Sequence, residues 1–227
     1  MESSEFSNIV SEIVEKEWHM FQAVNGEKRE ACQNDRQGFE ALRKAEFSAW
    51  SPAAASSYLK DLELAESTGR NLVREKYIRM MKSTAPTEYG FFQNELPEIS
   101  REKKALAEKI WVHMLEQTER LRKRFPAVAL GGRPLYAADE LDGWASIKTY
   151  RMGELLTCSP ETLSELLAHI EALETQGIDL AFEIQRNSIT CMGYSSMEEA
   201  ERAIAFQFIQ SMGGGKCNDC GVMADRI

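Results

Sequence analysis

The sequence predicts an all-α fold: a single globular multi-helix domain of about seven to eight helices, with little or no sheet. Apolar residues recur at spacings of three and four along most of the chain, which is the period of a helix with one buried face. No two-residue hairpin turn joins segments of alternating polarity, so strands are not indicated. With 227 residues, of which 43% are apolar, the chain is long enough to bury a core.

Short turn signals separate three helices that we expect in an N-terminal core over residues 6–83. Their approximate bounds are 6–24, 27–49 and 54–82. Asn25 and Gly26 end the first helix, and Pro52 ends the second because the residue before a proline disfavours helical backbone. Gly69 lies inside the third helix, where glycine costs about 1 kcal/mol relative to alanine, so we expect a close helix crossing or a kink there.

Proline, glycine and serine also mark the boundaries in the rest of the chain. Two prolines indicate a loop over residues 84–100, and Ser100 caps a fourth helix that ends near Phe125. The long connection 125–150 is rich in Pro, Gly and Asp, which makes it a candidate linker or lid. The expected C-terminal helices, within residues 159–212, begin near Ser159, Ile178 and Ser195 or Ser196.

Charge and hydropathy exclude some function classes. The net charge of −9 argues against a broad nucleic-acid-binding surface, which needs an excess of basic residues. No run approaches the roughly 20 apolar residues of a membrane span, and the N-terminus lacks the pattern of a secretory signal. We therefore expect a cytoplasmic protein with neither nucleic acid nor membrane as a partner, whose five cysteines are reduced thiols.

Charged residues should gather where the first three helices meet. Helices joined by short turns are antiparallel neighbours, so the end of the first helix lies beside the start of the second and the end of the third. Glu17 lies on an apolar stripe of the first helix. Leu42 marks the expected inward face of the second helix, so Asp35 is expected to face inward, as is Arg79 on the third. Buried carboxylates need partners. Either Lys76 and Arg79 neutralise Glu17 and Asp35 in a structural ion-pair network, or these groups line a polar pocket.

The pocket alternative predicts an enzyme, or an enzyme subunit, that acts on a small polar or anionic metabolite. Lys76 and Arg79 would bind the anion, and Glu17 or Glu75 would serve as general acid or base. Cys32, in the first turns of a helix, would be a nucleophile. Further substrate-binding side chains would be Trp18, Gln33, Asp35 and Tyr77. The alternative is a non-catalytic helical module that binds a partner protein or senses a ligand. In either case Arg70 and Arg74 lie off the inward face and are expected to be solvated.

The helical domain, residues 1–212, is followed by a tail over 213–227 that we expect to be flexible. Cys217 and Cys220 form a C-x-x-C motif in this tail, which supplies two of the four ligands of a structural zinc. A metal site would therefore need ligands from another chain. A reduced tail without metal and a redox-active pair are the alternatives.

Two arginines beside the long connection form a second candidate anion site. Arg133 and Arg151 could hold a phosphate or carboxylate, because the guanidinium fork matches either group. Alternatively, Glu154 pairs with Arg151 and the segment is structural.

Several segments together resemble a microbial family catalogued only as a domain of unknown function. They are EWHMFQAV, ACQNDRQGFEALRKAEFSAW, SYLKDLELAESTGRNLVREKYIRMM, TYRMGELLTCSPETL and MGYSSMEEAE, and they extend over roughly residues 9–203. The resemblance implies signature positions at Glu17, Trp18, Cys32, Gln33, Asp35, Trp50, Arg70, Asn71, Glu75, Lys76, Tyr77 and Arg79. Some relatives are joined to a nucleotidyltransferase-like domain, which implies a nucleotidyltransferase-like partner for this chain. The resemblance names no activity.

Overall fold

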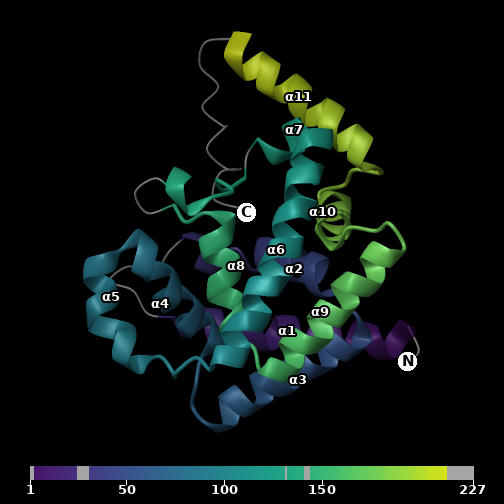
Figure 1. The fold of residues 1–227 in the computed structure, drawn as a ribbon. Coiled ribbons are helices and arrows are strands. Elements are labelled where there is room, and N and C mark those ends of the chain that lie inside the picture. Colours follow the sequence, from purple (N-terminus) through teal and green to yellow (C-terminus); the bar gives the residue numbers. More distant parts are fainter. Residues whose placement is uncertain (1–2, 25–30, 131, 141–143, 214–227) are drawn as a thin grey trace.

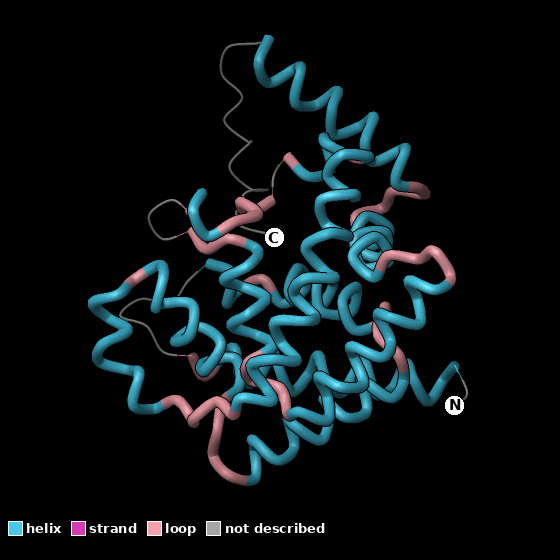
Figure 2. The backbone as a smooth tube through the Cα atoms, viewed as in Figure 1, coloured by secondary structure: helices cyan, strands magenta, loops and turns pink. Residues whose placement is uncertain are grey.

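A computed structural model describes residues 3–24, 31–130, 132–140 and 144–213 of the chain. Within these ranges the fold is all-α and has no strand, as predicted (Figures 1 and 2). The α-helices are α1 (Ser3–Gln22), α2 (Arg36–Phe47), α3 (Pro52–Ser67), α4 (Leu72–Thr84), α5 (Pro86–Phe92), α6 (Arg101–Arg124), α7 (Pro126–Ala129), α8 (Ile147–Leu155), α9 (Pro160–Thr175), α10 (Leu180–Cys191) and α11 (Met197–Gly213). Short 3-10 helices are η1 (Ala31–Asn34), η2 (Gln93–Glu95) and η3 (Ala137–Asp139).

The described residues form eleven α-helices, so the expected seven to eight was wrong. The predicted loop 84–100 contains α5 and η2, and the predicted connection 125–150 contains α7, η3 and the start of α8. Helices of four to seven residues, such as α7 and α5, are too short to show an apolar period in the sequence. The starts of α6 and α9 agree with the prediction, since the Ser100 and Ser159 side chains cap them.

Six helices close a ring around the main core. Neighbouring helices contact each other in the order α1, α3, α9, α6, α10, α2 and back to α1 (Figure 1). Each turns apolar residues inward, and Ile13, Leu62, Ile110, Leu163 and Ile170 are at most 1% exposed. Helix α8 packs on α6 and α4, and α4 packs on α1. Residues of α8 thereby reach the interior of the ring.

The predicted third helix, 54–82, is in fact two helices, α3 and α4. Gly69 has a φ of 70°, the left-handed conformation that commonly ends a helix, and the N–H of Arg70 bonds back to the carbonyl of Ala65 at 2.8 Å. Asn71 then caps α4, because its side chain accepts the N–H of the residue three positions on, at 2.8 Å. Gly69 therefore marks a chain reversal rather than a helix crossing.

The second helix begins later than predicted. Asp35 caps α2 by accepting the Gly38 N–H at 2.9 Å, and η1 precedes it. The expected start of this helix, at residues 27–30, lies outside the described residues, as does the tail from residue 214 onward.

A second, smaller core lies beside the ring. It consists of Phe125, Val128, Ile189, Met197 and Ala200, and it joins α7, α10 and the first half of α11. Among the described helices, none combines the length and apolarity that a membrane crossing requires.

Candidate functional site

Helices α2 and α8 carry charged side chains into the centre of the ring. Arg43 and Glu46 lie one turn apart on α2 and are 8% and 7% exposed. They face the core together with Phe47, whereas Leu42, which we expected to face inward, is 37% exposed. On α8, Arg151 and Glu154 are spaced in the same way and bond to each other at 3.2 Å, as one of the two alternatives predicted.

Glu17 is buried, as its position on the apolar stripe predicts, but its partners differ from the expected ones. Arg43 donates two hydrogen bonds to its carboxylate, from Nε at 2.6 Å and from Nη2 at 2.8 Å. The Tyr58 hydroxyl donates a third at 2.8 Å. Neither Lys76 nor Arg79 forms an ion pair with Glu17. Lys76 pairs instead with Glu154.

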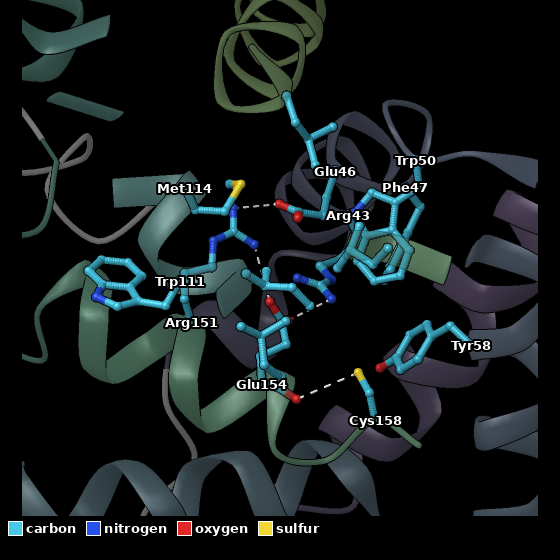
Figure 3. A pocket seen from close by; sticks show the side chains of 14 residues that line it. Arg43, Glu46, Phe47, Trp50, Tyr58, Trp111, Met114, Arg151, Glu154 and Cys158 are labelled. Atoms are coloured by element: carbon cyan, nitrogen blue, oxygen red, sulfur yellow. Dashed lines mark hydrogen bonds and ion pairs between the residues drawn. The ribbon is translucent and has the colours of Figure 1, made fainter. Parts of the chain in front are cut away.

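Glu154 is the hub of the network, and Figure 3 shows it between Arg43 and Arg151. Its Oε1 lies 2.8 Å from Arg43 Nη2 and 3.2 Å from Lys76 Nζ, and its Oε2 lies 3.2 Å from Arg151 Nη1. Arg151 also bonds to Glu46 at 2.7 Å. Three carboxylates (Glu17, Glu46, Glu154) thus face three cations (Arg43, Lys76, Arg151), and the buried network is neutral.

The charged forms of Glu154 and Lys76 are favoured by their neighbours in the network. Burial alone would raise the pKa of Glu154, but the charges of Arg43, Lys76 and Arg151 outweigh it and lower that pKa far below the usual range. Burial likewise opposes the charge of Lys76, yet the Glu154 carboxylate raises its pKa. Burial, with Glu17 next, raises the pKa of the Tyr58 hydroxyl well above its ordinary value. The shifts of Glu154 and Lys76 favour the ion pair between α8 and α4, so these two side chains hold the helices together.

A small cavity of about 20 Å³ adjoins this network. It is lined by Arg43, Glu46, Phe47, Trp50, Tyr58, Ile110, Trp111, Met114, Arg151, Glu154, Leu155, Cys158, Leu166 and Leu180 (Figure 3). The indole Nε1 of Trp50 is buried and has no hydrogen-bond partner among the described residues. The volume suits roughly one water molecule, so the cavity does not admit a metabolite.

The residues expected around the end of α1 hold that end in place. Gln33 Nε2 donates to the carbonyls of Phe21 and Val24, both at 3.0 Å, which satisfies groups that a helix terminus leaves open. Trp18 packs against Phe39, with ring centroids 5.2 Å apart. Tyr77 stacks on Phe21, with ring centroids 6.2 Å apart.

Glu75 is also paired. Arg70 donates two hydrogen bonds to its carboxylate, at 2.8 and 2.9 Å, so Arg70 is half-buried and paired rather than solvated as expected. Arg74, expected to be solvated, is partly exposed and pairs with Glu95. Cys32 lies in η1 ahead of α2 rather than in the first turns of that helix, and its side chain lies outside what the structure describes.

Arg79, which was expected to bind an anion, forms no ion pair with a described carboxylate, and the same is true of Arg133, whose Nε is also buried without a hydrogen-bond partner. The Nε of Arg79 is buried without a hydrogen-bond partner, and its Nη2 reaches the Pro97 carbonyl only at 3.4 Å. Burial has the largest effect on the pKa of Arg79 and lowers it, and the Glu75 charge opposes this shift. The Asp35 carboxylate, which we expected beside it, caps α2.

Lys103, in the first turn of α6, is a second cation without an ion pair among the described residues. Burial lowers its pKa, and the nearby charges of Arg70 and Arg79 lower it further. Glu75 is bonded to Arg70, and neither Arg79 nor Lys103 forms an ion pair with a carboxylate among the described residues. Lys103 was not predicted as a site residue, because nothing in the spacing of α6 links it to α4.

Arg133 and Arg151 do not form one anion site. Arg133 donates to the Ala145 carbonyl at 3.1 Å and lies over the ring of Tyr150, 5.1 Å from its centroid. Lys76 Nζ lies 3.6 Å from the same centroid, and Arg151 belongs to the buried network.

Within the described residues, no group of three or more His, Cys, Asp or Glu side chains could hold a metal ion. Cys217 and Cys220 lie outside those residues, so a metal site in the tail stays a prediction.

Comparison with known proteins identifies one family. The family model described as "Protein of unknown function (DUF4125)" matches residues 7–202. No curated protein matches the chain, and no solved structure matches it either.

Proposed function

Since the chain belongs to the DUF4125 family, whose description assigns no activity, we propose from its geometry that it binds a small anionic ligand through Arg79 and Lys103. In this proposal the protein is a helical ligand-sensing module rather than a catalyst. The observation that carries it is the buried, unpartnered Nε of Arg79 beside a second unpaired cation.

A guanidinium that loses water and gains no partner is unfavourable, and a second positive charge nearby makes it more so. An anion would relieve both effects, because a phosphate or carboxylate accepts hydrogen bonds from Arg79 and pairs with Lys103. Both side chains are partly exposed, so a dissolved ligand can reach them. The neighbouring Arg70–Glu75 pair would flank the ligand.

The same geometry gives catalysis less support. The carboxylates of Glu17 and Glu75, expected as general acid or base, are each held by an arginine through two hydrogen bonds. Lys76, expected to bind the anion, is paired with Glu154. An enzyme subunit that works with a nucleotidyltransferase-like partner stays a prediction from the resemblance, and a phosphate-bearing ligand would suit either form of the proposal.

Thermal unfolding with inorganic phosphate or acetate, at constant ionic strength in chloride, tests the binding. We expect at least one of these anions to raise Tm by about 3 °C at saturation, because a ligand that binds only the folded state stabilises it. Arg79→Gln and Lys103→Gln should each weaken binding about tenfold, the loss of one charge-assisted hydrogen bond.

The matched control is Lys104→Gln, next to Lys103 but exposed and paired with Glu108 at 3.9 Å. This variant should bind as the wild type does. Without ligand, Arg79→Gln should unfold at the same Tm as the wild type or higher, because it removes repulsion rather than a pair. No response to either anion, or an equal response in all three variants, would contradict the proposal.

A further inference from the structure

The two halves of α11 differ in what covers them. In the first half, Met197 and Ala200 are buried in the second core and Ile204 packs against it. In the second half, Phe206 and Ile209 are 61% and 67% exposed, and residues 206–211 are all exposed. Figure 1 shows this end of α11 extending past α7 and away from the ring.

The exposed half is apolar on more than one side. Phe208 lies two positions after Phe206 and Ile209 lies one position after Phe208, which at about 100° per residue distributes the three side chains around the helix. A helix that is apolar all round is normally buried. The three side chains are 46–67% exposed, so this half of α11 has the character of a buried helix without the covering protein.

Charge indicates what covers it. Residues 203–211, AIAFQFIQS, contain no charged residue, although the chain as a whole carries −9. Two copies of the chain repel each other over most of their surface, but they can meet along this stretch without burying a charge. A partner that binds through opposite charge would find no charged group to pair with in residues 203–211. Because this end of the helix extends away from the ring, two copies can also meet there with their ring helices apart.

We propose that the C-terminal half of α11 is a self-association surface, which packs against the same half-helix of a second copy of this chain. A two-fold arrangement removes both copies of Phe206, Phe208 and Ile209 from water at once. A large apolar side chain of this kind has an area of ~200 Å². With about half of that area exposed on each of the three side chains, the surface is on the order of 300 Å² per copy. Since stable interfaces bury about 800 Å² per partner, the dimer is weak and depends on concentration.

Analytical ultracentrifugation of the full chain between about 1 and about 200 µM, where weak interfaces dissociate, tests this. We expect the weight-average mass to rise with concentration from 25.7 kDa towards twice that value. Added salt should favour association, because it screens the repulsion between two acidic chains. A wild type that stays monomeric throughout would overturn the proposal.

Two double variants distinguish the loss of the self-association surface from unfolding of the helix. Phe206→Glu/Ile209→Glu should stay monomeric, and Phe206→Gln/Ile209→Gln, which adds no charge and favours helix, should associate at least tenfold more weakly than the wild type. Circular dichroism should show unchanged helix content in both. Leu64→Glu, at a 59% exposed apolar position on α3, is the matched control and should dimerise normally. Equal disruption by Leu64→Glu, or normal dimerisation of the glutamine variant, would overturn the assignment to α11.

Discussion

The Glu154 side chain determines how the ring is held at its centre. It lies 10% exposed and is the one carboxylate in the network that contacts all three of its cations. A buried ion pair adds little net stability compared with apolar packing, because the charges lose their hydration. Removing one partner is different, since it leaves a charge buried without compensation.

Glu154→Gln should therefore destabilise the protein by about 3–5 kcal/mol, because Arg43, Lys76 and Arg151 would remain with two carboxylates. Urea denaturation at neutral pH measures the free energy of unfolding. The control is Glu198→Gln, which removes the exposed pair with Arg124 and should change stability by less than about 1 kcal/mol. Similar losses in the two variants would mean that Glu154 is not the hub of the network.

The sequence predicted that Glu17 is buried, but it could not predict its partner. Periodicity gives the inward side of one helix, whereas Lys76 and Glu154 are 78 positions apart and meet only because α4 packs on α8. The sequence contained one indication of the partner of Glu17. Arg43 and Glu46 stand at helical spacing from Phe47 and Trp50 in the sequence, and all four are buried, so two opposite charges stood on an apolar stripe. We took Leu42 as inward instead, which shifted the helix face.

At the scale of elements, the turn between α3 and α4 sets the direction of α4. The prediction of one long helix failed because Gly69 was read as an unfavourable residue within a helix. The order Gly-Arg-Asn contained the correct reading, since glycine ends helices in the left-handed conformation and asparagine begins them. This reversal places α4 against α1 and α8, and thereby supplies Lys76 to the network and Arg79 to the proposed site.

Two glycine-to-alanine substitutions test whether Gly69 forms a left-handed turn or lies inside a helix. The two should change the free energy of unfolding in opposite directions. Gly69→Ala should lower the free energy of unfolding by about 1 kcal/mol, because alanine is strained at a φ of 70°. A Cβ meets no atom within 4 Å at Gly69 or at Gly90, so neither substitution creates a clash. Gly90→Ala, inside α5, should instead stabilise by about 0.5–1 kcal/mol. Thermal or urea unfolding of both variants checks this, and stabilisation by Gly69→Ala would contradict the left-handed turn.

At the scale of the whole molecule, Glu140 fastens the connection after α7 to the helices around it. Its carboxylate accepts the backbone N–H of Ser146 at 2.7 Å and the hydroxyl of Ser83, so it joins the end of α4 to the start of α8. Burial opposes the charge of this group, but the hydrogen bonds from Ser146, Ser83 and Thr149 outweigh it and lower the pKa of Glu140 to about 2.

The direction of that shift fixes how acid acts on the fold. Because the pKa of Glu140 is lower in the folded state than in the unfolded chain, its contribution is complete above about pH 5 and is lost as pH falls towards 2. Glu140→Gln should unfold more easily than the wild type near pH 6, and the two free energies of unfolding should converge near pH 2. Urea titrations across this range measure the difference. A difference that stayed constant or grew on acidification would show that the negative charge of Glu140 does not fasten the connection between α4 and α8.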